Sequence, residues 1–600
     1  MIYNPLDTFY KSQIGAVNAK ETITFRVKGN FDSVVFVYNK DGENCEKSLV
    51  MNKFDTYFQV EVSFETGLYF YYFKLNDNSF IGLGENYTGE IFDYQKPFQL
   101  TACDKDYAVP SWINGGVIYQ IFPDRFYRGE KDKTIEKGKI LHENWLDTPV
   151  YLPNEKGKII NNDFFGGDLN GIQQKLDYLK SLGVTAIYLN PIFKAFSNHR
   201  YDTGNYLEID SLLGTIEDFK DLIEKANDYG IKIILDGVFN HTGDDSVYFN
   251  KYGNYQSIGA YQDKNSEYYK WYNFTEYPNE YESWWGITTL PAINESNPEY
   301  VNFITGKDGV LEHYTKMGIG GWRLDVVDEL PSHFVEKIRQ AVKGVNKQAI
   351  VIGEVWEDVS NKISYGVRRK YFQGKELDSA MNYPLKEAII KFVKNKDAYS
   401  LAYLVKEQID HYPKKALDAL MNIISTHDTP RLLTVVGGEE PCGKSKTQLA
   451  NLSIPKENMQ NAIFKLKVAS LLQYTLCGVP SLYYGDEAGM QGYADPLNRT
   501  CYPWGQEDKE LIKWYQKLGQ IRKTYSAFKN GEYQEIFVSD GIYIFKRFDK
   551  KSEVMIAVNL SEKDVDLQFN GKLYDLVLEE EFVNSFTLKQ SSVAIMISID

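Results

Sequence analysis

The sequence predicts an α/β protein, namely a (β/α)8 TIM barrel with an inserted subdomain after its third strand, plus an N-terminal and a C-terminal β-sandwich domain. Three observations predict it. Short apolar runs alternate with amphipathic segments from residue 112 to residue 524, which is typical of such a barrel. Strand-like runs broken by turn residues fill both ends of the chain. The length of 600 residues allows about three or four domains.

The N-terminal sandwich is predicted over residues 1–105. Its apolar or alternating runs begin at Ile23, Val34, Tyr57 and Leu68, and turn residues separate them. This spacing is typical of an all-β sandwich. The same texture returns over residues 525–600, with runs that begin at Gly541, Val554 and Ser592, so a second sandwich is predicted there.

The barrel is predicted over residues 112–524. Its apolar runs begin at Gly116, Val184, Ile231, Gly321, Ala349, Leu420 and Val479. Helices are predicted over 171–182, 215–229 and 331–345, because their apolar residues recur at a spacing of three or four. The stretch 243–297 is long, aromatic and rich in Asn and Gly. It exceeds an ordinary connection, so it is predicted to be a subdomain inserted over the barrel mouth.

Acidic residues stand at the ends of several predicted strands, where the active sites of (β/α)8 barrels form. Asp236, Asp325 and Glu354 each end a run, and the cluster 425–428 ends another. A single acid there is best interpreted as a cap of the following helix. Four acids on one face repel one another, unless the site uses their charge for a cation or for developing positive charge.

Hydrolysis of a glycosidic bond requires such a group. One carboxyl group protonates the departing oxygen, and a carboxylate attacks or stabilises an oxocarbenium-like centre. Asp325 and Glu354 follow consecutive strands. Arg323 lies on the same side of its strand as Asp325 and is expected to keep that carboxylate ionised. The pKa of Glu354 is expected to be raised by its apolar neighbours.

Composition excludes other function classes. A net charge of −15 without a basic patch disfavours binding to nucleic acid and to an anionic membrane surface. No apolar stretch approaches the ~18 residues of a membrane span. Five scattered cysteines fit neither a disulfide framework nor a zinc site and suit a reducing compartment. Since no signal peptide is visible after Met1, a cytoplasmic location is expected.

With these residues assembled, the chain resembles the α-amylase superfamily (glycoside hydrolase family 13), nearest to its neopullulanase, cyclomaltodextrinase and amylopullulanase-like branch. Four ordered motifs carry the resemblance: Asp236-Gly-Val-Phe-Asn240-His241, Gly321-Trp-Arg323-Leu-Asp325, Ile352-Gly-Glu354-Val-Trp356 and Ser425-Thr-His427-Asp428. The resemblance implies that Asp325 is the nucleophile, Glu354 the acid/base and Asp428 the group that grips the hydroxyls of the reacting sugar. The N-terminal sandwich resembles the starch-binding-like module of this branch.

Further motifs imply the residues that bind substrate. The stretch 198–202 resembles a subsite in which Tyr201 stacks on the reacting sugar, and the stretch 492–499 resembles the loop that holds the next sugar on the non-reducing side. The implied substrate-binding residues are His199, Tyr201, Asp202, His241, Arg323, Trp356, His427, Asp495 and Arg499, with Asp236 and Asn240 as structural residues near the site.

Three other side chains keep two interpretations. Trp284 and Trp285 fit the core and the cleft equally well. Glu329 is interpreted as a cap of the helix that starts at Pro331, with a contact to the leaving-group sugar as the alternative. The histidines match no zinc spacing, so hydrogen bonding to sugar is favoured over metal ligation.

The calcium loop of relatives is interpreted as degraded here. Gly166 and Asp168 match the family pattern, but Arg128 and Lys133 stand where oxygen ligands are expected. Since Ca²⁺ takes 6–8 oxygens, a guanidinium or ammonium group is expected to replace the structural role of the cation. No cofactor is expected to be required, and Gly166, Asp168 and Glu130 are the only metal candidates.

The predicted function is retaining hydrolysis of α-1,4-glucosidic bonds through a covalent glucosyl-enzyme at Asp325. Maltooligosaccharides, cyclodextrins, pullulan and starch dextrins are the candidate substrates, and the sequence does not choose among them. Retention predicts carboxyl groups ~5–5.5 Å apart, against ~9 Å for inversion. The alternative is a 4-α-glucanotransferase acting on the same substrates. A non-catalytic carbohydrate-binding relative is disfavoured, because all three acids are present. Relatives with the N-terminal module often dimerise, so the resemblance also implies a homodimer.

Overall fold

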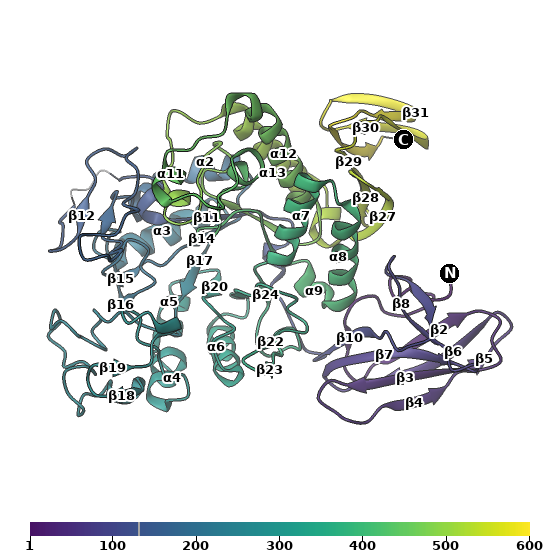
Figure 1. The fold of residues 1–600 in the computed structure, drawn as a ribbon, viewed down its shortest axis with the longest axis horizontal. Coiled ribbons are helices and arrows are strands. Elements are labelled where there is room, and N and C mark those ends of the chain that lie inside the picture. Colours follow the sequence, from purple (N-terminus) through teal and green to yellow (C-terminus); the bar gives the residue numbers. More distant parts are fainter. Residues whose placement is uncertain (130–132, 600) are drawn as a thin grey trace.

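The computed structural model describes residues 1–129 and 133–599, and within them the predicted barrel is confirmed. Its parallel strands follow one another around the ring in sequence order, and the last strand pairs with the first (Figure 1). A parallel bridge from Met381 to Met421 joins the sixth strand to the seventh. The strands are β11 (Ile118–Ile121), β14 (Ala186–Leu189), β17 (Lys232–Gly237), β20 (Gly321–Leu324), β21 (Ile350–Gly353), β24 (Ser379–Ala380), β25 (Met421–Ile423) and β26 (Val479–Tyr483).

The sixth strand is the one that no predicted run contains. β24 has only two residues, and it pairs with β21 through Ser379 and Ala380. Glu376 and Asp378, just before it, are fully buried polar residues. A strand of two residues is too short to contain an apolar run like those of the other seven strands. Its position is set by its pairing with neighbouring strands.

Helices cover the outside of the barrel. The predicted helix α3 (Ile216–Asp228) begins at a capping box of Thr215 and Asp218, and α6 (Ser332–Val345) is also confirmed. The predicted helix 171–182 is two helices, α1 (Leu169–Gln174) and α2 (Leu176–Ser181), because Lys175 between them leaves helical geometry. The other helices are α4 (Pro298–Thr305), α5 (Val310–Lys316), α7 (Tyr383–Asn395), α8 (Ala398–His411), α9 (Lys414–Leu417), α10 (Leu432–Gly437), α11 (Lys446–Ala450), α12 (Lys456–Thr475), α13 (Lys509–Thr524) and α14 (Ala527–Asn530).

Long excursions leave the barrel after its first three strands. The first contains β12 (Ile140–Leu141) and β13 (Asp163–Phe164), and the second is the hairpin of β15 (Phe193–Ala195) and β16 (Thr203–Ile209). The third, between β17 and α4, contains β18 (Phe274–Glu276) and β19 (Glu280–Tyr281) and is the predicted insertion. Aromatic contacts hold it together, for example Tyr248 stacked on Trp271 at 5.2 Å. Many of its tyrosines are therefore structural.

The N-terminal domain consists of two sheets that face each other. One has the order β1-β10-β7-β3-β4, with β8 attached to β7 and β9 attached to β8, and the other has the order β2-β6-β5. Aromatic side chains such as Phe25, Phe36 and Tyr71 fill the core between them. The strands are β1 (Val17–Asn18), β2 (Thr22–Lys28), β3 (Val34–Lys40), β4 (Lys47–Val50), β5 (Asn52–Lys53), β6 (Tyr57–Ser63), β7 (Gly67–Leu75), β8 (Phe80–Leu83), β9 (Gly89–Phe92) and β10 (Phe98–Cys103).

The C-terminal domain is one antiparallel sheet, in the order β27-β28-β29-β32-β30-β31. The sheet encloses a small core to which Ile544 of β28 and Phe586 of β31 both contribute. Its strands are β27 (Glu532–Ser539), β28 (Ile542–Phe548), β29 (Glu553–Asn559), β30 (Val565–Asp575), β31 (Glu580–Leu588) and β32 (Ser592–Ser598).

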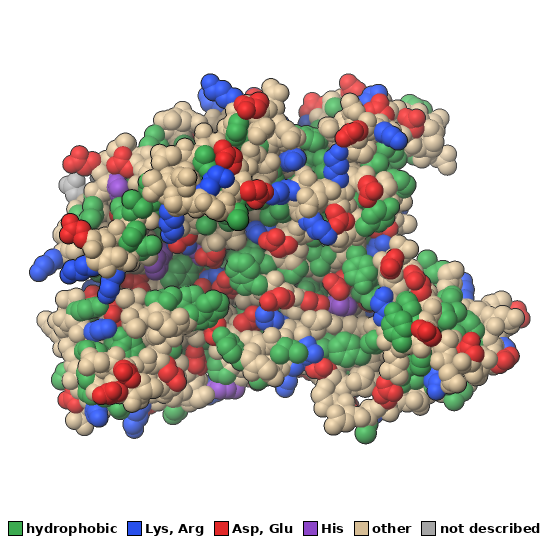
Figure 2. Space-filling view, in the orientation of Figure 1, with side chains coloured by type: hydrophobic (Ala, Val, Ile, Leu, Met, Phe, Trp, Pro, Cys, Tyr) green, Lys and Arg blue, Asp and Glu red, His purple; other side chains and the backbone are tan. Residues whose placement is uncertain are grey.

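Acidic and basic side chains are interspersed over the face of the molecule shown in Figure 2. None of the described helices is long and apolar enough to cross a membrane.

Candidate active site

The predicted acids meet at the C-terminal end of the barrel strands. Asp325 directly follows β20, Glu354 directly follows β21, and these two strands pair in parallel. Asp236 lies in β17, next to β20, and Asp428 lies in the loop after β25. Asp236, Asp325 and Glu354 are buried, while the side chain of Asp428 is partly exposed.

Arg323 in β20 joins three of these acids. Its Nη1 donates to Asp236 Oδ1 and to Asp325 Oδ1, and its Nη2 donates to Glu354 Oε2, each at 2.7 Å. The guanidinium group is fully buried. Because a planar guanidinium offers its donors in fixed directions, it holds the carboxylates of two consecutive strands close together.

The pKa of Asp325 differs from the prediction. Burial raises it well above the usual range of an aspartate, Arg323 opposes the rise, and the carboxylates of Glu354 and Asp236 add to it. The predicted contact with Arg323 is present and lowers the pKa of Asp325 as expected, but burial has the larger effect. One guanidinium is shared among three carboxylates in a buried site, so its charge does not outweigh burial and mutual repulsion.

Both oxygens of Glu354 are held by neighbouring donors. Oε2 accepts from the Val326 amide at 2.9 Å as well as from Arg323, and Oε1 accepts from Trp356 Nε1 at 3.0 Å. Val326 has φ +37, which is an outlier for a β-branched residue. This strained turn directly after Asp325 aims the amide at Glu354, and such strain occurs at functional sites.

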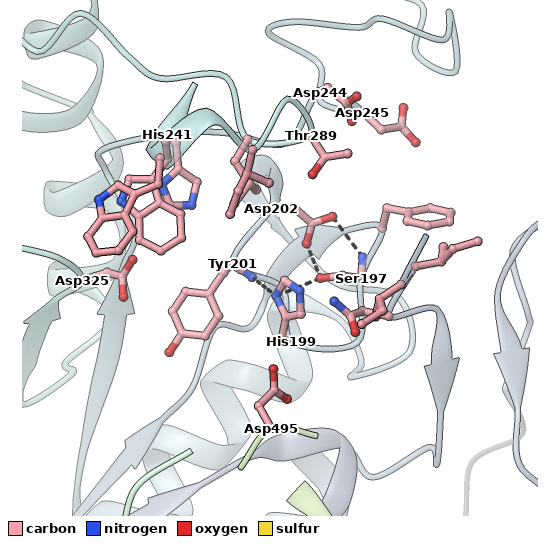
Figure 3. Close-up of a pocket in the computed structure, with 18 of the residues that line it drawn as sticks. Ser197, His199, Tyr201, Asp202, His241, Asp244, Asp245, Thr289, Asp325 and Asp495 are labelled. Carbon is pink, nitrogen blue, oxygen red and sulfur yellow. Dashed lines mark hydrogen bonds between the residues drawn. The ribbon is translucent and has the colours of Figure 1, made fainter. Parts of the chain in front are cut away.

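The turn between β15 and β16 brings a group of polar side chains to the same place (Figure 3). Tyr201 OH lies 2.9 Å from Asp236 Oδ2 and 2.6 Å from His427 Nε2. The Tyr201 amide donates to His199 Nδ1 at 3.1 Å, and Asp202 accepts from the amide of Ser197 at 3.1 Å. The Tyr201 ring is therefore anchored beside the acids with its orientation set by hydrogen bonds.

These residues line a pocket of about 920 Å³. The predicted site residues on its wall are His199, Tyr201, Asp202, His241, Asp325, Glu354, Trp356, His427, Asp428, Asp495 and Arg499. Arg499 Nη1 pairs with Asp495 Oδ1 at 2.9 Å and its Nη2 lies 3.6 Å from Asp428 Oδ1. Arg323, Asp236 and Asn240 lie behind the wall. Arg323 contacts the three carboxylates, and its role in substrate binding stays a prediction.

The three histidines of the pocket favour the neutral form. Burial lowers the pKa of His199 to about 3 and that of His241 to about 4, and it lowers the pKa of His427 as well. Nε2 of His241 is buried without a hydrogen-bond partner. Among the described residues, no group of three or more His, Cys, Asp or Glu is placed to hold a metal ion. Neutral imidazoles in such a pocket are suited to hydrogen bonds with hydroxyl groups.

Part of the pocket wall has no signal in the sequence. Residues 158–161 in the excursion after β11 line it, as do Phe196, Asp244 and Asp245. These residues carry no motif or periodicity, so nothing in the sequence marks them. Behind this wall, Gln120 of β11 contacts His427 Nδ1 at 2.8 Å. A polar residue within an apolar strand is the one signal in the sequence for this contact.

The structure also decides between the two interpretations that the sequence leaves open for Trp284, Trp285 and Glu329. Trp284 and Trp285 both line the pocket, and Trp284 stacks on His241 at 5.4 Å, so neither belongs to the core. Glu329 is not a helix cap, because no side chain caps α6. Its carboxylate instead accepts hydrogen bonds from Trp285 and Tyr365.

Cationic side chains lie beside Gly166 and Asp168, the predicted metal candidates. Lys133 Nζ contacts Asp168 and donates to Leu212 O at 2.7 Å. Arg128 Nη2 donates to Phe165 O at 2.8 Å, next to Gly166. Asp168 also caps α1 through the Gly171 amide at 2.6 Å. Glu130 lies outside the described residues.

The acids converge at one end of a (β/α)8 barrel, beside a pocket lined by aromatic and polar side chains. This arrangement is typical of active sites that cleave glycosidic bonds. The family model "Alpha amylase, catalytic domain" matches residues 120–508. The chain belongs to the α-amylase family of glycoside hydrolases.

Relatives agree with this assignment. The chain is 35% identical over 611 residues to an amylopullulanase of Thermoanaerobacter thermohydrosulfuricus. The alignment covers 90% of this chain and 40% of that protein. It is 33% identical over 478 residues to a cyclomaltodextrinase of Thermoanaerobacter pseudethanolicus, covering 77% and 73% of the two chains. The solved type III pullulan hydrolase of Thermococcus kodakarensis superposes with a TM-score of 0.70 at 25% identity, covering 99% of this chain and 100% of that one. The chain spans 35% to 51% of the length of the amylopullulanases.

Proposed function

We propose that this chain hydrolyses α-1,4-glucosidic bonds with retention of configuration. The proposal rests on the hydrogen bonds of Arg323 to Asp325 and Glu354. These bonds hold the proposed attacking group and the proposed proton donor side by side at one pocket. Closely spaced carboxyl groups support retention, because inversion needs room for a water molecule between them.

The proposed steps use these residues directly. An oxygen of Asp325 attacks the anomeric carbon while Glu354 gives its proton to the departing glycosidic oxygen, and a glucosyl-Asp325 ester forms. Glu354 then takes a proton from water, whose oxygen attacks the same carbon and releases Asp325. Glu354 Oε2 already accepts two donors, so we place the acidic proton on Oε1.

Substrate binding is proposed to use the rest of the pocket wall. Asp428 accepts hydroxyls of the reacting sugar, Tyr201 presents its ring to that sugar, and Asp495 and Arg499 hold the next sugar. Neutral histidines suit an uncharged ligand, and the net charge of −15 repels no part of a carbohydrate without phosphate. A homodimer through the N-terminal domain stays a prediction.

A substrate panel tests the proposal. Cyclodextrin, pullulan, soluble starch and maltotriose are incubated with the chain, and product sizes and the anomer released first are recorded by NMR. We expect shorter products whose new reducing ends are initially α, because two displacements restore the configuration. Initial β-anomers would contradict retention. In the incubation with maltotriose alone, products longer than maltotriose would show that transfer to sugar, not hydrolysis, resolves the intermediate.

We further propose that the barrel needs no calcium at Asp168, because Lys133 and Arg128 contact the oxygens there. A chelator is then expected to leave the midpoint of thermal unfolding unchanged. Lys133→Met is expected to lower the free energy of unfolding by about 3 kcal/mol, since it leaves a buried carboxylate unpaired. Lys137→Met, at an exposed position nearby, is the control. A midpoint that falls with chelator and recovers with Ca²⁺ would overturn the proposal.

A further inference from the structure

Trp285 stands at the tip of a strained turn at the edge of the pocket. The Ile287 amide donates to Trp284 O at 2.9 Å, and the two residues between them, Trp285 and Gly286, have φ +51 and φ +76. Two successive left-handed residues define a type I′ turn, which favours Asn or Gly at its first position. A tryptophan there is an outlier that points to a function.

Tyr365 stands in the same position of a second such turn. The strands β22 (Ile363–Ser364) and β23 (Val367–Arg368) pair as a hairpin, and the two residues that join them, Tyr365 and Gly366, have φ +50 and φ +76. The hairpin belongs to the segment between β21 and β24, whereas Trp285 belongs to the insertion after β17. Two unrelated segments thus each present an aromatic ring from a strained tip.

Glu329 ties the two rings together. Trp285 Nε1 donates to Glu329 Oε1 at 3.0 Å, and Tyr365 OH donates to Glu329 Oε2 at 2.6 Å. The two aromatic residues are 77% and 72% exposed, so both rings keep open surface. Hydrogen bonds to a charged acceptor are stronger than neutral ones, and they fix rings that would otherwise turn freely in solvent.

The tied rings lie at the boundary of the pocket. Trp285 lines the pocket together with Glu354 and Trp356, while Glu329 and Tyr365 are not part of its wall. Glu329 lies in the segment between Asp325 and α6. If Glu354 is the proton donor, this boundary is where the leaving part of a glucan emerges.

The N-terminal domain supports the hairpin. Arg368, in β23, donates through Nε to Asp41 Oδ2 at 2.8 Å and through Nη2 to Asp41 Oδ1 at 3.1 Å. A two-point contact between guanidinium and carboxylate fixes orientation as well as distance. Asp41 follows β3, so a residue of the N-terminal domain helps to position the turn that carries Tyr365.

We propose that Glu329 is a positioning residue that holds Trp285 and Tyr365 as one platform for the leaving part of a long glucan, with Asp41 bracing it from the N-terminal domain. The proposal rests on the proposed function, because it takes Glu354 as the acid. Aromatic faces stack on the apolar faces of sugars, and rings fixed in advance lose less freedom on binding. The platform therefore favours substrates long enough to reach it.

Chain-length dependence tests this inference. The ratio kcat/KM is measured on maltotriose and on maltoheptaose for the parent chain, Glu329→Ala, Tyr365→Phe and Asp41→Asn. Glu329→Ala is expected to lower the value for maltoheptaose about tenfold, which corresponds to about 1.4 kcal/mol, and the value for maltotriose less than about twofold. Tyr365→Phe keeps the ring and loses only the tether, so it should lower the maltoheptaose value in the same direction, and Asp41→Asn should do so by less.

Glu357→Ala is the matched control, because it removes a nearby exposed carboxylate that pairs with Lys362. It is expected to change neither ratio. Equal losses on both substrates, or no loss in Glu329→Ala and Tyr365→Phe, would overturn the inference while the proposed function stands. A parent chain without activity on any α-glucan would instead overturn the proposed function. Thermal unfolding of each variant identifies one that fails to fold, and Tyr365→Phe then carries the test.

Discussion

Asp325→Asn is expected to lower kcat on α-glucans by at least about 10⁴-fold, the scale of loss when a nucleophile is removed. The amide is nearly the same size and cannot form the glucosyl ester. The pKa of Asp325 is raised mainly by burial, so a neutral side chain there should not weaken the fold. Kinetics on maltotriose and a thermal unfolding curve measure the two effects.

The control is Asp495→Asn, which changes another carboxylate of the pocket wall. Asp495 pairs with Arg499 and is proposed to hold a sugar beyond the reacting one. Its loss is therefore expected to raise KM more than it lowers kcat. Asp325→Asn with activity close to that of the parent would refute the assignment of the nucleophile.

Arg323→Met is expected to lower the free energy of unfolding at pH 7 by about 3–5 kcal/mol, because it leaves buried carboxylates without their cation. Arg323 lowers the pKa values of Asp325 and Asp236, both of which burial raises. Without Arg323 these pKa values rise further. The carboxylates are charged in the unfolded chain above about pH 4, so the loss of stability should be largest at neutral pH and should shrink as the pH falls and the folded state takes up protons.

Denaturant unfolding at pH 5 and pH 7.5 measures this difference. Arg522→Met is the matched control, because Arg522 is equally buried but donates to the main-chain carbonyl groups of Gly116, Tyr474 and Gly478. Its loss of stability should not vary between the two pH values. An equal loss for Arg323→Met at both values would mean that repulsion among the acids does not govern the site.

Much of the fold could be predicted because it is local. The strands that end in Asp325 and Glu354 are apolar runs, and α3 begins at a capping box that four consecutive residues define. β24 could not be predicted, because a two-residue strand has no pattern and is placed by pairing with β21 and by the bridge to Met421. The break at Lys175 likewise has no signal in an amphipathic stretch.

The sequence by itself determined the barrel, its flanking β domains and the acids at the strand ends, because runs, turns and strand-end motifs are read from residues close together in the chain. Only the tertiary structure decided how these residues share charge and contacts. Asp236, Asp325 and Glu354 share one guanidinium, and burial raises the pKa of Asp325 although Arg323 lowers it. Glu329 binds two rings from segments far from it in sequence. Burial and long-range contact set these properties, and neither is encoded in the spacing of neighbouring residues.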